Sequence, residues 1–137
     1  MAINQISAGI QFKYQNITSL KKWISGVLKV EKCRVGDITI VFCSDDYLLE
    51  VNKTYLSHDY YTDVITFDYS EGYKISGDIM ISVDRVVENS KIYSVDFINE
   101  LDRVIIHGIL HLIGYSDYDY QSKYQMKQKE DYFLSKR

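Results

Sequence analysis

The stretch VDFINELDRVIIHGILHLI, residues 95–113, is the longest segment of the chain with apolar side chains at helical spacing. These side chains wrap most of the way round a helix instead of lining one stripe, which is typical of a helix buried inside a domain. They are Phe97, Ile98, Leu101, Val104, Ile105, Ile106, Ile109, Leu110, Leu112 and Ile113. We expect Ser94 to open this helix and Gly114, which suits the left-handed conformation, to end it. The segment therefore predicts a central buried helix.

In the segments on either side of this helix, hydrophobic residues recur in some places at every second position, as in a strand, and in others at every third or fourth position, as in a helix. The expected strands cover residues 3–12, 37–43, 64–69 and 75–82, and the last two form a hairpin through Ser70–Tyr73. The other expected helices cover residues 18–32, 45–55, a short stretch across Val86 and Val87, and 119–134. This order predicts one α+β domain, with a small mixed sheet of about four strands and helices packed on it.

Composition and charge limit the location and the partners of the chain. The 137 residues carry a net charge of −3, and no apolar run approaches the ~20 residues of a membrane span. The N-terminal stretch MAINQISAGIQFKYQN lacks a signal-peptide pattern, and two distant cysteines fit a reducing compartment, so we expect the cytoplasm. Tight nucleic-acid binding by bulk charge is not expected without a basic excess, which leaves only local patches of lysine and arginine.

Two histidines, His107 and His111, lie one turn apart on the expected central helix. Side chains four residues apart share one helix face, so two ring nitrogens can reach the same ion. After Gly114 the chain can turn back and present Asp117 as a third ligand. The pattern H-x3-H-x2-G-x2-D matches a three-ligand site whose fourth position is open for a metal-bound water. The alternative, two ordinary core histidines, is disfavoured by the register of Gly114 and Asp117.

Two charged residues share the histidine face of this helix. Glu100 lies seven positions before His107, and Arg103 lies four positions before it. Glu100 could accept a hydrogen bond from an imidazole and fix its tautomer, and Arg103 could contact a phosphate. An ordinary intrahelical ion pair between Glu100 and Arg103 explains both residues equally well.

Three classes of function compete for such a site. A zinc protease of similar spacing uses a glutamate after the first histidine as general base, and here that position is Gly108. A structural site would be closed by a fourth protein ligand, for which only Asp119 is near in the sequence. A hydrolase of another ester, such as a phosphodiester, needs only an ion that polarises the phosphate and generates hydroxide. The residues favour this third class.

The motifs of the chain resemble those of a known family. HGILHLIGYSD, residues 107–117, is similar to the HGxLHLxGYDH signature of the YbeY family of metal-dependent endoribonucleases. VNKTYLSHDYYTDVITF, residues 51–67, resembles the family's LNxxYRxxDxPTDVLSF block, and SGDIMIS, residues 76–82, resembles its GDIxIS strand. Met126 stands where the family often has a methionine. Together the motifs follow the family's order over residues 44–130.

The resemblance implies a single YbeY-like endoribonuclease domain over residues 1–137, with one divalent ion, zinc, held by His107, His111 and Asp117. It implies hydrolysis of single-stranded RNA in late maturation of the 3′ end of small-subunit ribosomal RNA, and a role in ribosome quality control. Ribosomal RNA and small-subunit ribosomal proteins are the implied partners. A zincin-like metalloprotease or other hydrolase, and a ribosome-assembly protein that binds with little catalysis, stay as alternatives.

Two positions depart from the family's pattern. The third ligand position, usually histidine, is Asp117, and the usual arginine of the YRxxD block is replaced by Leu56. His58 or Arg103 could supply the missing positive charge. The family places this block near its cleft, which makes Asp63 a candidate catalytic residue beside Arg103. Local hydrogen bonding in a turn before a strand explains Asp63 as well.

Overall fold

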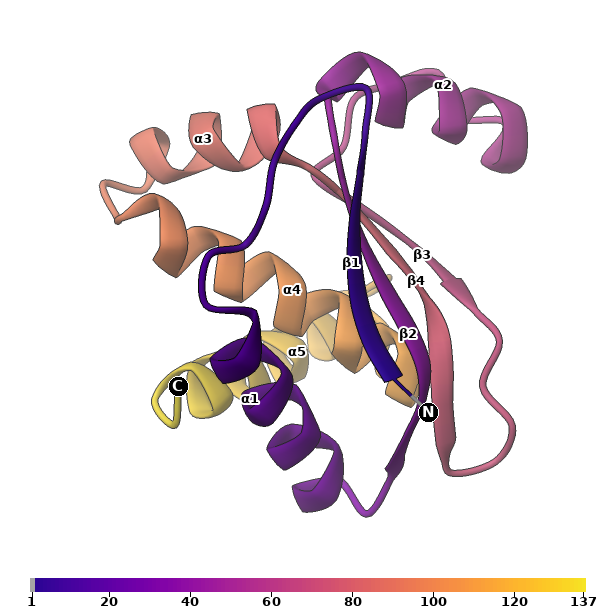
Figure 1. The fold of residues 1–137 in the computed structure, drawn as a ribbon, viewed down its shortest axis with the longest axis vertical. Coiled ribbons are helices and arrows are strands. Elements are labelled where there is room, and N and C mark those ends of the chain that lie inside the picture. The colour runs from indigo at the N-terminus through magenta and orange to yellow at the C-terminus, as the bar shows by residue number, and fades with distance from the viewer. Residues whose placement is uncertain (1) are drawn as a thin grey trace.

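Five helices and four strands make up residues 2–137, which are the residues described by the computed structural model (Figure 1). The strands are β1 (Ala2–Ala8), β2 (Arg34–Cys43), β3 (Val64–Asp68) and β4 (Lys74–Ser82). The helices are α1 (Ile17–Val30), α2 (Asp45–Leu56), α3 (Val83–Ile92), α4 (Phe97–Ile113) and α5 (Tyr120–Leu134). The order of elements and the α+β class agree with the sequence-based prediction.

The four strands form one mixed sheet in the order β1-β2-β4-β3. β1 and β4 both pair in parallel with β2, and β3 pairs antiparallel with β4. Because side chains alternate along a strand, Ile40 and Phe42 of β2 face the main core, whereas Val41 and Cys43 face a smaller cluster under α2. Figure 1 shows α1, α3, α4 and α5 together on the side of the main core.

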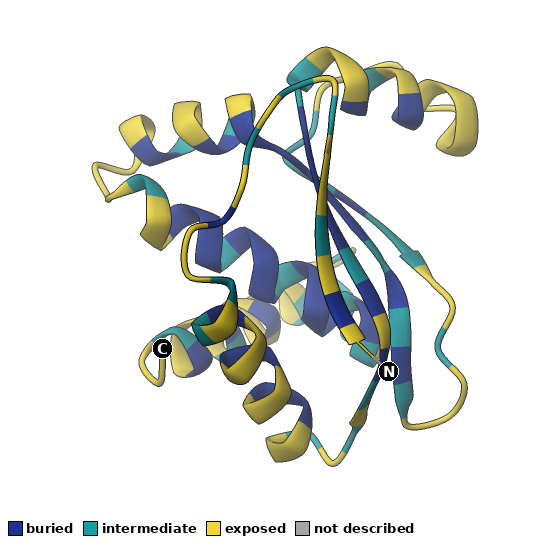
Figure 2. Ribbon diagram, in the orientation of Figure 1, coloured by how far each residue is buried: buried dark blue, intermediate teal, exposed yellow. Residues whose placement is uncertain are grey.

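α4 lies in the middle of the main core. It packs on β3 and β4, and α3 and α5 contact it from other directions. Ten of its 17 residues are buried, and Figure 2 shows a nearly continuous buried stretch along its length. The apolar side chains of α4 join those of the sheet and of α1 in a single cluster.

Gly108 permits a close approach of α4 to β4. An ideal Cβ at this position would lie 2.6 Å from Cγ2 of Ile79, so position 108 faces the sheet. Successive helical residues are about 100° apart, so His107 and His111 lie about 100° and about 60° from the sheet-facing direction. This places both histidines at the edge of the buried face, where each is half-buried.

Several element boundaries differ from the expected ones, most notably the end of β1 and the starts of β2 and α4. β1 ends at Ala8 instead of residue 12, because Gly9 turns the chain with φ +73°. β2 begins three residues earlier than expected, at Arg34. Ser94 does not open α4, because it has φ +56° in the connection after α3, and Asp96 holds the N-cap position instead. The prediction for Ser94 was wrong because cap preferences do not distinguish the end of one helix from the start of the next.

The two cysteines are both free. Cys33 directly precedes β2 and Cys43 is its last residue, so the length of a ten-residue strand separates them and excludes a mutual disulfide. Within residues 2–137, no helix combines the length and the apolar character that a membrane crossing requires.

The close contact at Gly108 predicts opposite outcomes for two glycine-to-alanine changes in helices. Gly108→Ala gains helix propensity, about 1 kcal/mol, but forces a methyl group against Ile79, and such overpacking costs about 1–3 kcal/mol. We expect a net loss in the free energy of unfolding measured by urea titration. Gly26→Ala in α1 is the matched control, because no atom lies within 4 Å of its added Cβ, and it should stabilise. Equal stabilisation by both changes would contradict the assigned contact.

Candidate metal centre

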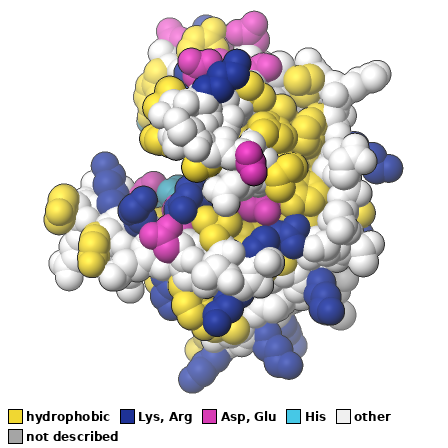
Figure 3. Space-filling model, turned by 90° about the vertical axis from the view of Figure 1, so that its left-hand side faces the viewer, with side chains coloured by type: hydrophobic (Ala, Val, Ile, Leu, Met, Phe, Trp, Pro, Cys, Tyr) yellow, Lys and Arg dark blue, Asp and Glu magenta, His cyan; other side chains and the backbone are white. Residues whose placement is uncertain are grey.

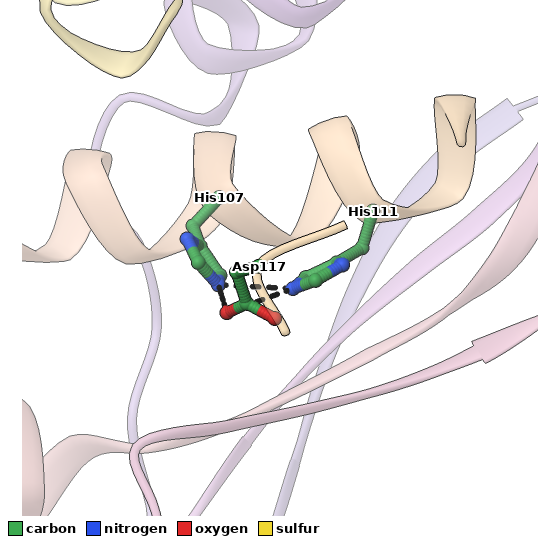
Figure 4. Close-up of side chains that lie close together, drawn as sticks. All are labelled: His107, His111 and Asp117. Carbon is green, nitrogen blue, oxygen red and sulfur yellow. Dashed lines mark hydrogen bonds and ion pairs between the residues drawn. The ribbon is translucent and has the colours of Figure 1, made fainter. Parts of the chain in front are cut away.

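His107 and His111 from α4 and Asp117 from the following loop place their ligand atoms within 4.8 Å of one another (Figure 4). The two Nε2 atoms are 3.0 Å apart. Oδ2 of Asp117 lies 3.3 Å from Nε2 of His107 and 3.5 Å from Nε2 of His111. Gly114 makes this convergence possible, because its φ of +123° ends α4 and lets the chain turn back toward the histidines.

The partners of the two Nδ1 atoms determine the tautomers of both imidazoles. Nδ1 of His111 lies 3.0 Å from the backbone oxygen of Tyr115, which can only accept a hydrogen bond. Nδ1 of His107 lies 2.6 Å from Oε2 of Glu130, which also accepts when it is ionised. Both Nδ1 atoms must therefore donate, and in the neutral rings each Nε2 carries a lone pair.

Three lone-pair donors therefore converge on one point, and this arrangement is repulsive unless a proton or a cation lies between them. Donor atoms around a tetrahedral zinc ion lie about 3.4 Å apart, given Zn–N distances of about 2.1 Å. The separations of 3.0, 3.3 and 3.5 Å fit such a set. Two imidazoles and one carboxylate could thus hold a divalent metal ion with one position left for substrate or water.

Glu130 of α5 links the histidines to an ion-pair network. Burial lowers the pKa of His107, but the hydrogen bond and the negative charge of Glu130 outweigh it, so the net shift is upward. Nη1 of Arg103 lies 3.0 Å from Glu130, and its Nη2 lies 2.8 Å from Asp131. Arg103 therefore orients the carboxylate that orients His107, and two of its nitrogen atoms are already engaged with α5.

The loop that carries Asp117 is held at both ends. Before it, the Tyr115 hydroxyl donates to Glu31, which also pairs with Lys129 at 3.0 Å. After it, Asp119 caps α5 by accepting a hydrogen bond from the backbone of Ser122 in a capping box. Asp119 is thus engaged in the helix cap and is absent from the ligand cluster of the described residues.

Two cavities meet at the metal centre. The larger, of about 730 Å³, lies between α3, α4 and α5, and the smaller, of about 310 Å³, lies beside the end of α2 and the start of β3. Asp63, Val64, His107 and Asp117 line both. Figure 3 shows this hollowed face, with a histidine visible among acidic and basic side chains.

Basic side chains are distributed unequally between the two cavities. Arg103, Lys123 and Lys127 line the larger cavity. Leu56 and His58 line the smaller one, whose described lining contains no lysine or arginine. His58 stacks on Tyr60 with ring centroids 5.1 Å apart. Any contact with several phosphates is therefore favoured on the side of the larger cavity.

Asp63 lies at the boundary between the cavities. Burial raises the pKa of its carboxyl group, and the nearby His107 lowers it by a smaller amount. Its side chain accepts a long hydrogen bond, 3.5 Å, from Asn89, and among residues 2–137 it forms no ion pair with the histidines. Asp63 is therefore beside the metal centre but outside the ligand set.

The acceptor that fixes the His107 tautomer was not found from sequence. Glu100 was one candidate acceptor, beside an ordinary ion pair with Arg103, but its carboxylate forms no hydrogen bond with either imidazole, and Glu130 is the acceptor. The signal available in the sequence was the spacing of Met126, Glu130 and Phe133 at i, i+4 and i+7, which puts them on one helix face, and this face is the buried one in α5. A carboxylate on the buried face of a helix needs a partner, but spacing along one helix does not reveal a partner on another.

Comparisons with known proteins were consistent with one another. The family model described as Endoribonuclease YbeY matches residues 3–137. A protein from Parabacteroides distasonis named Endoribonuclease YbeY is 50% identical over 117 residues, which cover 85% of this chain and 82% of the relative. A protein of the same name from Cytophaga hutchinsonii is 44% identical over 128 residues, covering 93% of this chain and 90% of the relative.

A solved structure also resembles the fold. The solution structure of a protein from Thermotoga maritima superposes with a TM-score of 0.68 at 26% sequence identity. The similarity covers 98% of this chain and 87% of that chain.

Matched aspartate substitutions distinguish a ligand from a helix cap. Asp117→Ala should abolish stoichiometric zinc binding, as should His111→Ala, because each removes one of three converging donors. Asp119→Ala should keep full zinc affinity and instead lower the free energy of unfolding by about 1 kcal/mol through loss of the cap. Elemental analysis after dialysis and urea titration separate the two effects. If Asp119→Ala lost zinc while Asp117→Ala kept it, the ligand assignment would be wrong.

Glu130 and Asp131 form a second matched pair. Both accept from Arg103, but only Glu130 contacts His107. Glu130→Gln should weaken zinc affinity about 10- to 100-fold by making the imidazole less basic, whereas Asp131→Asn should change it little. In the metal-free protein, Glu130→Gln should also lower the pKa of His107, read from its NMR titration, because the charge that raises it is gone. Equal effects of both variants would show that only the Arg103 network matters.

Proposed function

The chain belongs to the endoribonuclease YbeY family, and we propose that it hydrolyses single-stranded RNA at a zinc ion held by His107, His111 and Asp117. Its class as a metal-dependent endoribonuclease follows from the family model over residues 3–137 and from relatives of that name. The observation that carries the assignment of the site is the convergence of three lone-pair donors at the point where two cavities meet.

The donor set supports zinc as the resident ion. Two imidazole nitrogens favour zinc over magnesium, which prefers oxygen ligands and retains its water. The carboxylate of Asp117, at the position where the family usually has histidine, leaves the ion with one positive charge less. Such a set should tolerate manganese better than three histidines would. When bound, the ion supplies a Lewis acid for a phosphate oxygen and lowers the pKa of water.

The side chains around the ion have separate roles in this proposal. Glu130 and the Tyr115 carbonyl hold the two imidazoles in the tautomers that present Nε2. Arg103 acts as a positioning residue through Glu130, since two of its nitrogen atoms are engaged with α5. Asp63, with a pKa raised by burial at the boundary of the cavities, suits proton transfer beside the reacting phosphodiester.

The distribution of charge supports a single strand of RNA as the substrate. The net charge of −3 gives no general attraction for nucleic acid, so phosphate contacts must come from local groups such as Lys123 and Lys127. An unpaired strand can bend into a cleft and expose its bases, whereas a duplex cannot. We propose the 3′ end of small-subunit ribosomal RNA as the biological target, in the cytoplasm, with small-subunit ribosomal proteins assisting its delivery.

The geometry at position 108 argues against a protease. A zincin needs a carboxylate directly after the first histidine, but position 108 faces Ile79 in the sheet and has no space even for a Cβ. A side chain at that position would be directed into the sheet and away from the ion-binding edge of α4, where the histidines lie.

Cleavage of a labelled RNA tests the proposed function. The zinc-loaded protein should cut a single-stranded RNA and leave the same strand intact when it is annealed to its complement. Chelator or His111→Ala should abolish cutting, because the ion is lost, while Asp131→Asn should keep it. Casein should stay intact under the same conditions. Metal-dependent cleavage of casein with RNA left intact would reverse the proposal, and cleavage of neither would favour a binding role in ribosome assembly.

A further inference from the structure

Glu100 is the exception among the buried polar residues of the chain. The six such residues among those described are Asn52, Ser82, Ser90, Glu100, Asp102 and Glu130. The side chains of the other five form hydrogen bonds; Asp102, for example, accepts from Tyr14 at 2.6 Å and from Arg137 at 3.2 Å. Glu100 is only 4% exposed, and within residues 2–137 its carboxylate forms no hydrogen bond or ion pair. Its oxygens are not among the side-chain atoms that are both sealed from solvent and without a partner, so they open on the cavity that Glu100 lines. Carboxylate oxygens that face a cavity without a protein partner are available to hydrogen-bond donors of a ligand.

Glu100 lines the larger cavity, on the same helix face as the histidines. It lies seven residues before His107, which is two turns or about 10 Å along the axis. Burial raises the pKa of its carboxyl group, Arg103 lowers it, and Asp63 raises it again. The carboxylate is therefore in an unfavourable setting that hydrogen-bond donors from a ligand would relieve.

The rest of the larger cavity has the parts that a nucleotide needs. Val64, Val104 and Met126 line it with apolar surface, which suits the faces of a base. Tyr93 also lines it and is 62% exposed, so its ring is available for stacking. The exposed Lys123 and Lys127 can meet a phosphate. The volume of about 730 Å³ is within the range of small-molecule sites, about 300–1,000 Å³.

We propose that the larger cavity binds an unpaired guanine next to the scissile phosphodiester, with the Glu100 carboxylate accepting from its N1–H and N2–H groups. A carboxylate offers acceptors only, and guanine is the one common base with two adjacent N–H donors on its Watson–Crick edge. Adenine and cytosine offer one amino group beside an acceptor, and uracil offers one N–H between two carbonyls. Glu100 is thus a specificity-determining residue, and its position beside the reaction rests on the proposed function.

Nucleotide titrations test the base site without relying on cleavage. In chelator, with binding followed by NMR, guanosine 5′-monophosphate should bind about tenfold tighter than the adenosine, cytidine and uridine monophosphates, as expected for one good bidentate contact. Glu100→Gln should remove this preference, because an amide replaces one acceptor with a donor. Glu88→Gln, an exposed change on α3 outside the cavity lining, should preserve it. Lys127→Ala should weaken the binding of all four nucleotides to the same extent, because a contact with the phosphate does not distinguish one base from another.

The outcomes separate this inference from the proposed function. Equal affinity of the wild-type protein for the four nucleotides overturns the guanine site, even if Glu100→Gln fails to fold. A guanine preference that persists in Glu100→Gln overturns the role of Glu100. With a single guanine in an otherwise polyadenylate strand, the zinc-loaded protein should cut beside the guanine, and cutting elsewhere overturns the placement beside the scissile bond. A guanine preference without cleavage of any RNA leaves the base site standing and refutes the proposed function.

Discussion

The contact between α4 and β4 at Gly108 and Ile79 sets the position of every group in the candidate site. With a Cβ absent at position 108, the helix lies close on the sheet, and its rotation about its own axis is determined by that contact. The two histidines then lie at the edge of the buried face, half-buried, where their rings are supported by protein on one side and accessible on the other. A helix rotated by one residue would turn both histidines into the core or both toward solvent.

Polar contacts with α5 orient the histidines that this packing positions. A buried imidazole has two possible tautomers, and only the one protonated on Nδ1 can offer Nε2 to an ion. The Glu130 carboxylate selects it for His107, and the backbone oxygen of Tyr115 selects it for His111. Because Glu130 lies on the buried face of α5, the docking of α5 on α4 and the chemistry of the site are coupled. Arg103 strengthens this coupling by pairing with two carboxylates of α5.

Basic side chains are concentrated on one side of the candidate metal centre. The lining of the larger cavity contains three basic residues and the carboxylate of Glu100, whereas the smaller one has Leu56 and the stacked pair of His58 and Tyr60. Arg103, one of two candidates for the charge that Leu56 lacks, is engaged with α5 instead. Such asymmetry suits a substrate that is held firmly on one side of the reacting bond and loosely on the other. An acidic protein can bind a polyanion in this way, through a few local contacts.

The sequence by itself determined the order of the elements, the α+β class, and the grouping of two histidines with one aspartate that the structure brings together. Each of these depends on local patterns: hydrophobic periods, a helix face shared at a spacing of four residues, and a glycine that ends the helix. Even the end of α4 at Gly114 follows from one residue's freedom to adopt positive φ. The prediction that Ser94 opens the same helix was wrong. Ser94 lies in the short connection between α3 and α4, and a serine there can end one helix as well as begin the next.

Only the tertiary structure decided which groups from distant segments meet. Glu130 of α5, and not the candidate Glu100, is the partner of His107, and Arg103 pairs across to α5 instead of along its own helix. These contacts join residues more than 20 positions apart and depend on how the helices dock. The place of Glu100 in the lining of the larger cavity was decided in the same way, because it depends on the packing of α3, α4 and α5 around that helix face.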